Sequence, residues 1–117
     1  MTATMTFAGL DVHARSTHAA AIDVHTGELR RARFGASGEE VIAWLRALPQ
    51  PLHACYEAGP TGFGLQRHLI ECGIDCQVVA PGLVPQRPGD RIKTDPRDAR
   101  KLARLLAGGL LEAIHVP

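Results

Sequence analysis

Thr6-Phe7-Ala8-Gly9-Leu10-Asp11-Val12-His13 is the stretch from which the fold of this chain can be built outward. A nearly continuous apolar run of this length is typical of a strand buried at the centre of a sheet. The run ends in a carboxylate, which is costly to bury unless it is paired or binds a ligand. We therefore expect a central strand over residues 6–13, with Asp11 as a candidate functional residue.

The segments that follow predict two further strands, over residues 16–24 and 29–34, joined by a turn at residues 25–28. Together with the first strand they form an antiparallel meander. Residues 53–57 and 74–79 predict a fourth and a fifth strand, and the fourth again ends in a carboxylate, Glu57. Three helices complete the pattern. Their expected N-caps are Ser37, Thr61 and Asp95, and they are expected to end before Pro49, Gly73 and Gly108.

This order of elements predicts one α/β domain over residues 1–117, with a mixed five-stranded sheet and helices on its faces. A right-handed crossover places the fourth strand beside the first at the centre of the sheet. Asp11 and Glu57 then end neighbouring strands at one edge. No signal peptide or membrane-length apolar segment is visible. Three cysteines without a CxxC spacing indicate reduced thiols in a cytoplasmic protein.

The start of the third helix carries two more carboxylates. Asp95 is a good N-cap, and Asp98 follows three residues later. At about 100° per residue, both lean toward the apolar stripe of Ala99, Leu102, Ala103 and Leu106. An acidic helix start can be no more than a cap that complements the helix dipole. The alternative is that Asp95 and Asp98 join Asp11 and Glu57 in one site.

Four converging carboxylates would repel one another strongly unless cations offset their charge. Two divalent ions balance the four charges, and hard oxygen ligands favour Mg²⁺ or Mn²⁺. Two such ions about 3.5–4 Å apart clamp a phosphodiester during in-line displacement. The arrangement predicts cleavage or transfer of phosphodiester bonds.

Positive charge is concentrated in one segment of a chain whose net charge is only +1. Residues 87–104 hold seven of the thirteen Lys and Arg residues, whereas residues 1–86 are slightly acidic. Such an asymmetry indicates a polyanionic partner, although a solvated helix face gives the same pattern. The candidate nucleic-acid contacts are Arg87, Arg91, Lys93, Arg97, Arg100, Lys101 and Arg104.

Three blocks of the chain resemble the DEDD transposase family of insertion-sequence recombinases, which are relatives of the Piv-type DNA invertases. The blocks are Gly9–His13, Tyr56–Gly62 and Lys93–Ala99, the last followed by Leu102-Ala103. The resemblance implies a RuvC-like domain with a ribonuclease-H fold. It also implies that Asp11, Glu57, Asp95 and Asp98 are the family's catalytic, metal-binding tetrad.

The resemblance has further implications for partners. Family members recombine DNA under the guidance of a structured noncoding RNA, in the bacterial cytoplasm at the nucleoid, and as homo-oligomers. They continue into a second domain with a catalytic serine. Neither Ser16 nor Ser37 resembles that motif, so this chain is expected to be the N-terminal part of a longer protein. The isolated domain is then expected to be inactive.

Other functions fit the same residues less well. A sugar-kinase or actin-like ATPase half would need glycines after the first strand, and residues 13–17 have none. A stand-alone RuvC-like nuclease that cuts Holliday junctions or other branched DNA shares the chemistry. A non-catalytic module for RNA binding or dimerisation would keep the acidic cluster without using it.

Overall fold

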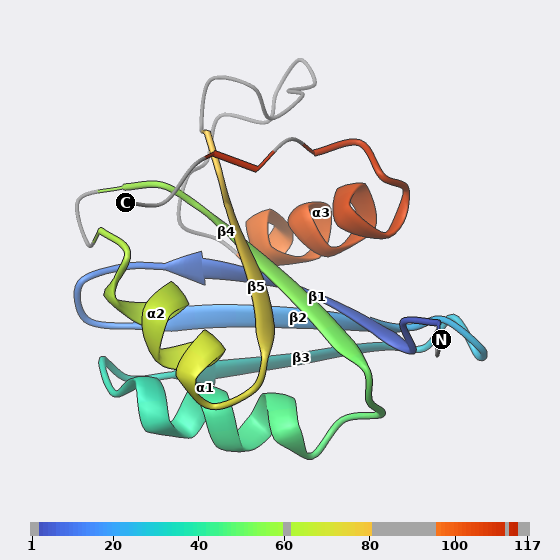
Figure 1. Ribbon diagram of the computed structural model, residues 1–117, viewed down its shortest axis with the longest axis horizontal. Helices are drawn as coiled ribbons and strands as arrows, with labels where there is room; N and C mark the ends of the chain where they lie inside the picture. The colour runs from blue at the N-terminus through green and yellow to red at the C-terminus, as the bar shows by residue number, and fades with distance from the viewer. Residues whose placement is uncertain (1–2, 60–61, 81–95, 112, 115–117) are drawn as a thin grey trace.

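The computed structural model describes residues 3–59, 62–80, 96–111 and 113–114, and for residues 96–98 it describes the backbone alone. Eight elements follow one another along the chain (Figure 1). In order they are β1 (Thr6–Val12), β2 (Thr17–Asp23), β3 (Leu29–Phe34), α1 (Gly38–Arg46), β4 (Leu52–Glu57), α2 (Gly64–Glu71), β5 (Asp75–Val79) and α3 (Pro96–Ala107).

The five strands form one mixed sheet in the order β3-β2-β1-β4-β5. β1 pairs antiparallel with β2 and parallel with β4, so it occupies the centre as the sequence predicted. The remaining pairs are antiparallel β2–β3 and parallel β4–β5. A three-strand meander followed by α/β crossovers is the mixed α/β architecture expected for a ribonuclease-H-like domain, and the predicted fold class is confirmed.

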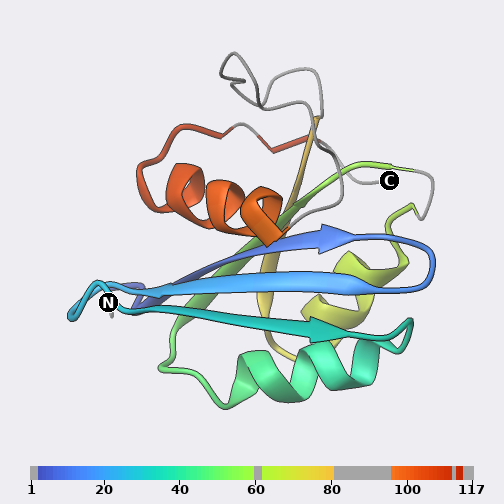
Figure 2. The same cartoon turned by 180° about the vertical axis from the view of Figure 1, so that it is seen from behind.

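The helices divide between the two faces of the sheet (Figures 1 and 2). α1 and α2 cover one face, where Leu45 and Leu69 join Ala8 and Leu10 of β1 in the larger core cluster. α3 covers the other face, where Leu102 and Leu106 pack with Cys55 and Val79. Alternation along β1 therefore sends Gly9 and Asp11 toward α3, because side chains two residues apart share a face of the sheet.

α3 lies unusually close to the central strand. A Cβ atom built on Gly9 would approach the carbonyl oxygen of Ala99, and would lie 2.6 Å from the backbone nitrogen of Ala103. The stripe predicted for this helix is buried, with Ala99, Leu102, Ala103 and Leu106 all at most 8% exposed. A glycine in β1 is thus required for the helix backbone to rest on the sheet.

Of the predicted helix N-caps, Thr61 needs correction and Asp95 lies outside the described residues. α2 begins at Gly64 with Phe63 at the N-cap, so Thr61 is not its N-cap. The glycine-rich turn delays the helix because Gly62 has a φ of 73°, which is not helical. The predicted cap Asp95 is outside the described residues, although α3 does begin at Pro96. Within the described residues no helix is long and apolar enough to span a membrane.

Candidate active site

Asp11 and Glu57 lie at the same edge of the sheet, at the carboxyl ends of adjacent parallel strands. The last paired residues of β1 and β4 are Leu10 and Tyr56, and the two carboxylates come next along each strand. Both side chains belong to the α3 face, because Asp11 alternates with Gly9, and Glu57 with Cys55. The predicted juxtaposition of these two strand ends is present in the backbone.

Asp11 is held in a setting that leaves part of its carboxylate unsatisfied. Its side chain is only 14% exposed, and its Oδ1 atom lies 3.0 Å from Nε2 of His13. That approach lacks hydrogen-bond geometry. Asp11 Oδ2 and His13 Nε2 are buried atoms without a hydrogen-bond partner in the described part of the chain. Because a buried unpaired carboxylate oxygen is unfavourable, this atom is where a ligand would be expected.

The side chain of His13 is 33% exposed, and its ring nitrogen faces Asp11. The histidine follows β1 and turns the chain toward β2, where its backbone N–H donates to the carbonyl of Ser16 at 2.9 Å. This turn returns the ring toward Asp11, two residues earlier. Sequence spacing alone gives no signal for that approach.

The other half of the predicted tetrad is described only in part. Asp98 is a residue of α3, one position before Ala99, which contacts Gly9, but its side chain lies outside the description. Asp95 lies outside it altogether. Among the described residues no group of three or more His, Cys, Asp or Glu side chains forms a metal cluster. The tetrad therefore stays a prediction, with two members placed at one edge.

The predicted nucleic-acid contacts divide in the same way. Arg87, Arg91 and Lys93 lie outside the described residues, and so does the side chain of Arg97. On α3, Arg100 and Lys101 are half-buried and Arg104 is exposed, all away from the buried stripe. Arg31 and Arg33 of β3 are also exposed, and they were not among the predicted contacts. The alternation of β3 was the signal that both share one face of the sheet.

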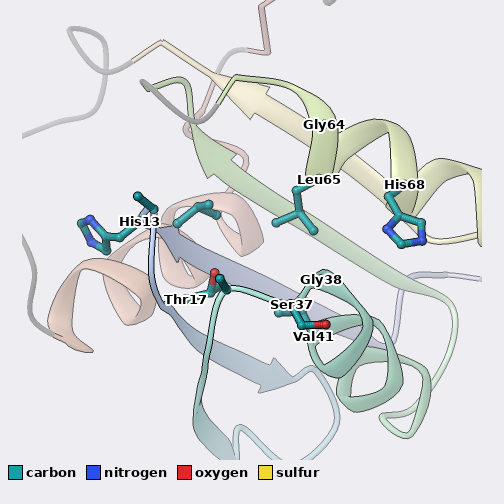
Figure 3. Close-up of a pocket in the computed structure, with 11 residues that line it drawn as sticks. His13, Thr17, Ser37, Gly38, Val41, Gly64, Leu65 and His68 are labelled. Carbon is teal, nitrogen blue, oxygen red and sulfur yellow. The ribbon is translucent and has the colours of Figure 1, made fainter.

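A separate groove of about 300 Å³ lies on the opposite face, between the carboxyl end of β1 and the starts of α1 and α2. Its lining includes Thr17, Ser37, Leu65 and His68 but neither Asp11 nor Glu57. Figure 3 shows the His13 ring at its rim, turned away from Leu65 and His68. Ser37 is already used there, because its hydroxyl accepts from the backbone N–H of Glu39 and caps α1. The groove is distinct from the carboxylate edge.

The chain is similar to transposases along nearly its whole length. A family model described as a transposase, of the DEDD type typified by IS110, matches residues 8–117. The chain is 43% identical over 118 residues to a putative transposase, y4qE, of Sinorhizobium fredii, covering 95% of this chain. It is 36% identical over 104 residues to the transposase for insertion sequence element IS1533 of Leptospira borgpetersenii, covering 86% of this chain. It spans about 30% of the length of each relative.

Proposed function

The chain belongs to the IS110-type family of DEDD transposases, and on that premise we propose that it acts in RNA-guided DNA recombination that moves an insertion sequence. Transposases of this family have nuclease or recombinase activity in general. The proposal assigns Asp11, Glu57, Asp95 and Asp98 to one acidic site. That site supplies the metal-binding tetrad for phosphodiester cleavage and strand exchange.

The observation that carries the proposal is the unsatisfied carboxylate of Asp11. Oδ2 is buried without a hydrogen-bond partner in the described chain, at the end of the central strand and beside the end of β4. A merely structural aspartate at 14% exposure would be expected to use both oxygens in hydrogen bonds. An atom that is desolvated but unpaired is suited to bind a cation.

The donor set fits a hard divalent cation. DEDD transposases generally use divalent metal ions, and aspartate and glutamate oxygens are the ligands that Mg²⁺ and Mn²⁺ prefer. We propose that Asp11 and Glu57 hold two such ions from the sheet, and that Asp95 and Asp98 hold them from the start of α3. Bound there, the ions would polarise a phosphodiester and stabilise the charge that develops on its oxygens.

The register of α3 supports the second half of this assignment. Ala99 contacts Gly9. One step from Ala99 toward the start of the helix is Asp98, and the next residue on the α3 face toward the end of β1 is Asp11. Figure 1 shows α3 beginning on the side of the sheet toward which β1 ends. The partners we propose are DNA, a structured guide RNA, a serine domain and further copies of the chain, in the bacterial cytoplasm at the nucleoid.

Metal-dependent stabilisation tests the site without requiring activity. Mg²⁺ or Mn²⁺ at one hundred times its dissociation constant should stabilise the fold by about 2.7 kcal/mol, because it binds the folded state alone. Asp11→Asn should abolish this increase in melting temperature. Asp75→Asn is the matched control, since Asp75 lies at the amino end of β5, is 70% exposed and pairs with His53 at 2.7 Å.

The two variants separate a specific site from general ion effects. If Asp11→Asn keeps the full increment, the assignment of the metal site is wrong. If both variants lose it equally, the ions act on overall charge and the site is also wrong. Cleavage of branched DNA by the isolated chain would favour the stand-alone RuvC-like nuclease, whereas RNA binding with no metal response would favour the non-catalytic module.

A further inference from the structure

A basic surface that includes two arginines outside the predicted nucleic-acid contacts borders the candidate active site. The register of the sheet places Arg31 opposite Ala20, which is opposite Gly9, the residue in contact with α3. Directly opposed residues share a face of the sheet. Arg31 and, by alternation, Arg33 therefore extend from the α3 face of the edge strand, and both are exposed.

α3 leaves β3 uncovered and turns a third arginine toward it. The helix packs against β1, β2 and β4, and Leu105 on its flank joins the cluster of Cys55 and Val79, toward β4 and β5. Arg100 lies about 140° around the helix axis from Leu105, on the other flank of the buried stripe. That flank faces β2 and β3. We call Arg31, Arg33 and Arg100 the basic flank.

The charges of the basic flank are not neutralised within the described residues. None of the three guanidinium groups has an ion-pair partner there, whereas Arg30 on the opposite face of β3 pairs with Glu28 at 3.4 Å. On the α3 face of β1, β2 and β3, the described residues include one acid, Asp11. Guanidinium groups that lack an acidic partner among the described residues are suited to bind phosphate oxygens, because each can donate two parallel N–H bonds.

The basic flank is aligned with the carboxylate edge. Asp11 is opposite His18, and His18 is opposite Arg33, so one row crosses three strands. Two strand spacings separate the backbones of Asp11 and Arg33, on the order of 10 Å. An extended arginine side chain can reach a phosphate close to one held at Asp11. A backbone that passes over Asp11 can therefore continue across β2 onto β3.

We propose that the basic flank binds the phosphodiester backbone of the nucleic acid whose reacting phosphate lies at Asp11. The inference rests on the proposed function, because it assumes that the reacting phosphate is held at Asp11. Charge complementarity selects the partner: three arginines without an ion-pair partner in the described part of the chain, beside the proposed cation site, fit a polyanion with regularly spaced charges. DNA and RNA share this backbone, and the experiment distinguishes them.

The test compares arginine-to-glutamine variants on the two faces of β3. Affinity for a 20-base-pair DNA duplex and for a single-stranded RNA of equal length is measured against salt in EDTA, with no divalent ion. Arg33→Gln should lower the slope of log K against log salt by about 0.9 on duplex DNA or about 0.7 on single strands, and Arg31→Gln combined with Arg33→Gln by twice that. Arg30→Gln, on the opposite face, should leave the slope unchanged.

The outcomes are separable from those of the metal test. A lower salt slope in the arginine variants on DNA alone, or on RNA alone, supports the proposed surface and identifies the nucleic acid that it binds. Equal behaviour of the double variant and Arg30→Gln on both probes overturns the inference, as does the absence of binding by the unaltered chain. Tighter binding of poly-glutamate than of either nucleic acid also overturns it, in favour of an acidic protein. The Mg²⁺-dependent rise in melting temperature tests the Asp11 site separately, because the binding measurements contain no divalent ion.

Discussion

At the scale of single residues, the thiol of Cys55 shows how dry the interface beneath α3 is. Cys55 is fully buried on β4, and its sulfur approaches the carbonyl of Leu102 at 3.9 Å. Burial, with a smaller contribution from the charge of Glu57, raises the pKa of this thiol from 9.0 to about 12. Burial likewise raises the pKa of Cys76. Both thiols stay protonated at neutral pH, as expected for core cysteines.

This shift predicts a loss of stability in alkali. Between about pH 9 and pH 12 the folded chain retains the Cys55 proton, whereas the unfolded chain releases it. The free energy of unfolding therefore falls as pH rises through that window, by at most about 1.4 kcal/mol per pH unit for each thiol. Below pH 8 the thiol contributes no pH dependence.

Urea titrations at pH 8, 9 and 10 measure this slope. Cys55→Ala should be less stable at pH 8, because it leaves a small cavity, but its stability should fall less steeply with pH. Cys72→Ala is the control, since Cys72 is only half-buried. A slope in Cys55→Ala as steep as in the unaltered chain would assign the alkaline loss to other groups.

At the scale of elements, the contact between α3 and β1 is what holds Asp11 beside the start of the helix. Gly9 permits it, because a Cβ atom there would lie 2.8 Å from Cβ of Leu102 as well as against the helix backbone. Gly9→Ala should therefore destabilise the fold by about 3 kcal/mol, the upper part of the range for overpacking, since backbone atoms cannot rotate aside.

The matched control for this substitution is Gly35→Ala, because no atom lies within 4 Å of a Cβ at Gly35 and its φ is not positive. That change should be neutral or slightly stabilising. Chemical denaturation curves of the two variants measure the difference. Equal midpoints would mean that α3 can lift from the sheet without cost, and the helix would then be a poor platform for a metal site.

The elements also show what could be read from the sequence. Strand positions, the central place of β1 and the buried stripe of α3 followed from periodicity and the crossover rule, and they are confirmed. The predicted start of α2 was wrong. A threonine is a good cap in sequence, but the positive φ of Gly62 prevents the helix from beginning before Gly64. The approach of His13 to Asp11 and the shared face of Arg31 and Arg33 depend on turn geometry and strand register, which single residues do not encode.

At the scale of the whole molecule, the α3 face of the sheet carries both the carboxylate edge and the basic flank. Asp11 and Glu57 lie at the ends of two central strands, and Arg31 and Arg33 of the basic flank lie across β2 from Asp11. The proposed metal site and the proposed phosphate-binding surface therefore lie side by side on the face of the sheet that α3 covers. Neither feature supplies a covalent nucleophile.

We therefore expect that the 117-residue chain alone does not recombine DNA. Strand exchange by the serine mechanism that the family resemblance implies conserves the energy of the phosphodiester bond through a covalent intermediate on a protein nucleophile. Ser37 is committed to the cap of α1, whereas Ser16 lies in the turn beside His13. We propose that the nucleophilic serine belongs to a second domain, as the family resemblance implies; the two relatives are about three times as long as the matched region.

The assay combines the chain with Mg²⁺, guide RNA and both DNA substrates, and scores recombinant product. None should form until a serine domain from a relative is supplied, in cis or as a separate chain, and Asp11→Asn should then prevent it. Recombination by the isolated chain would contradict the two-domain requirement. Ser16→Ala would then test the nearest serine: loss of product would assign the nucleophile to the β1–β2 turn beside Asp11. Retention would exclude Ser16 and favour hydrolysis of one strand followed by attack of the freed DNA 3′-hydroxyl on the second phosphodiester.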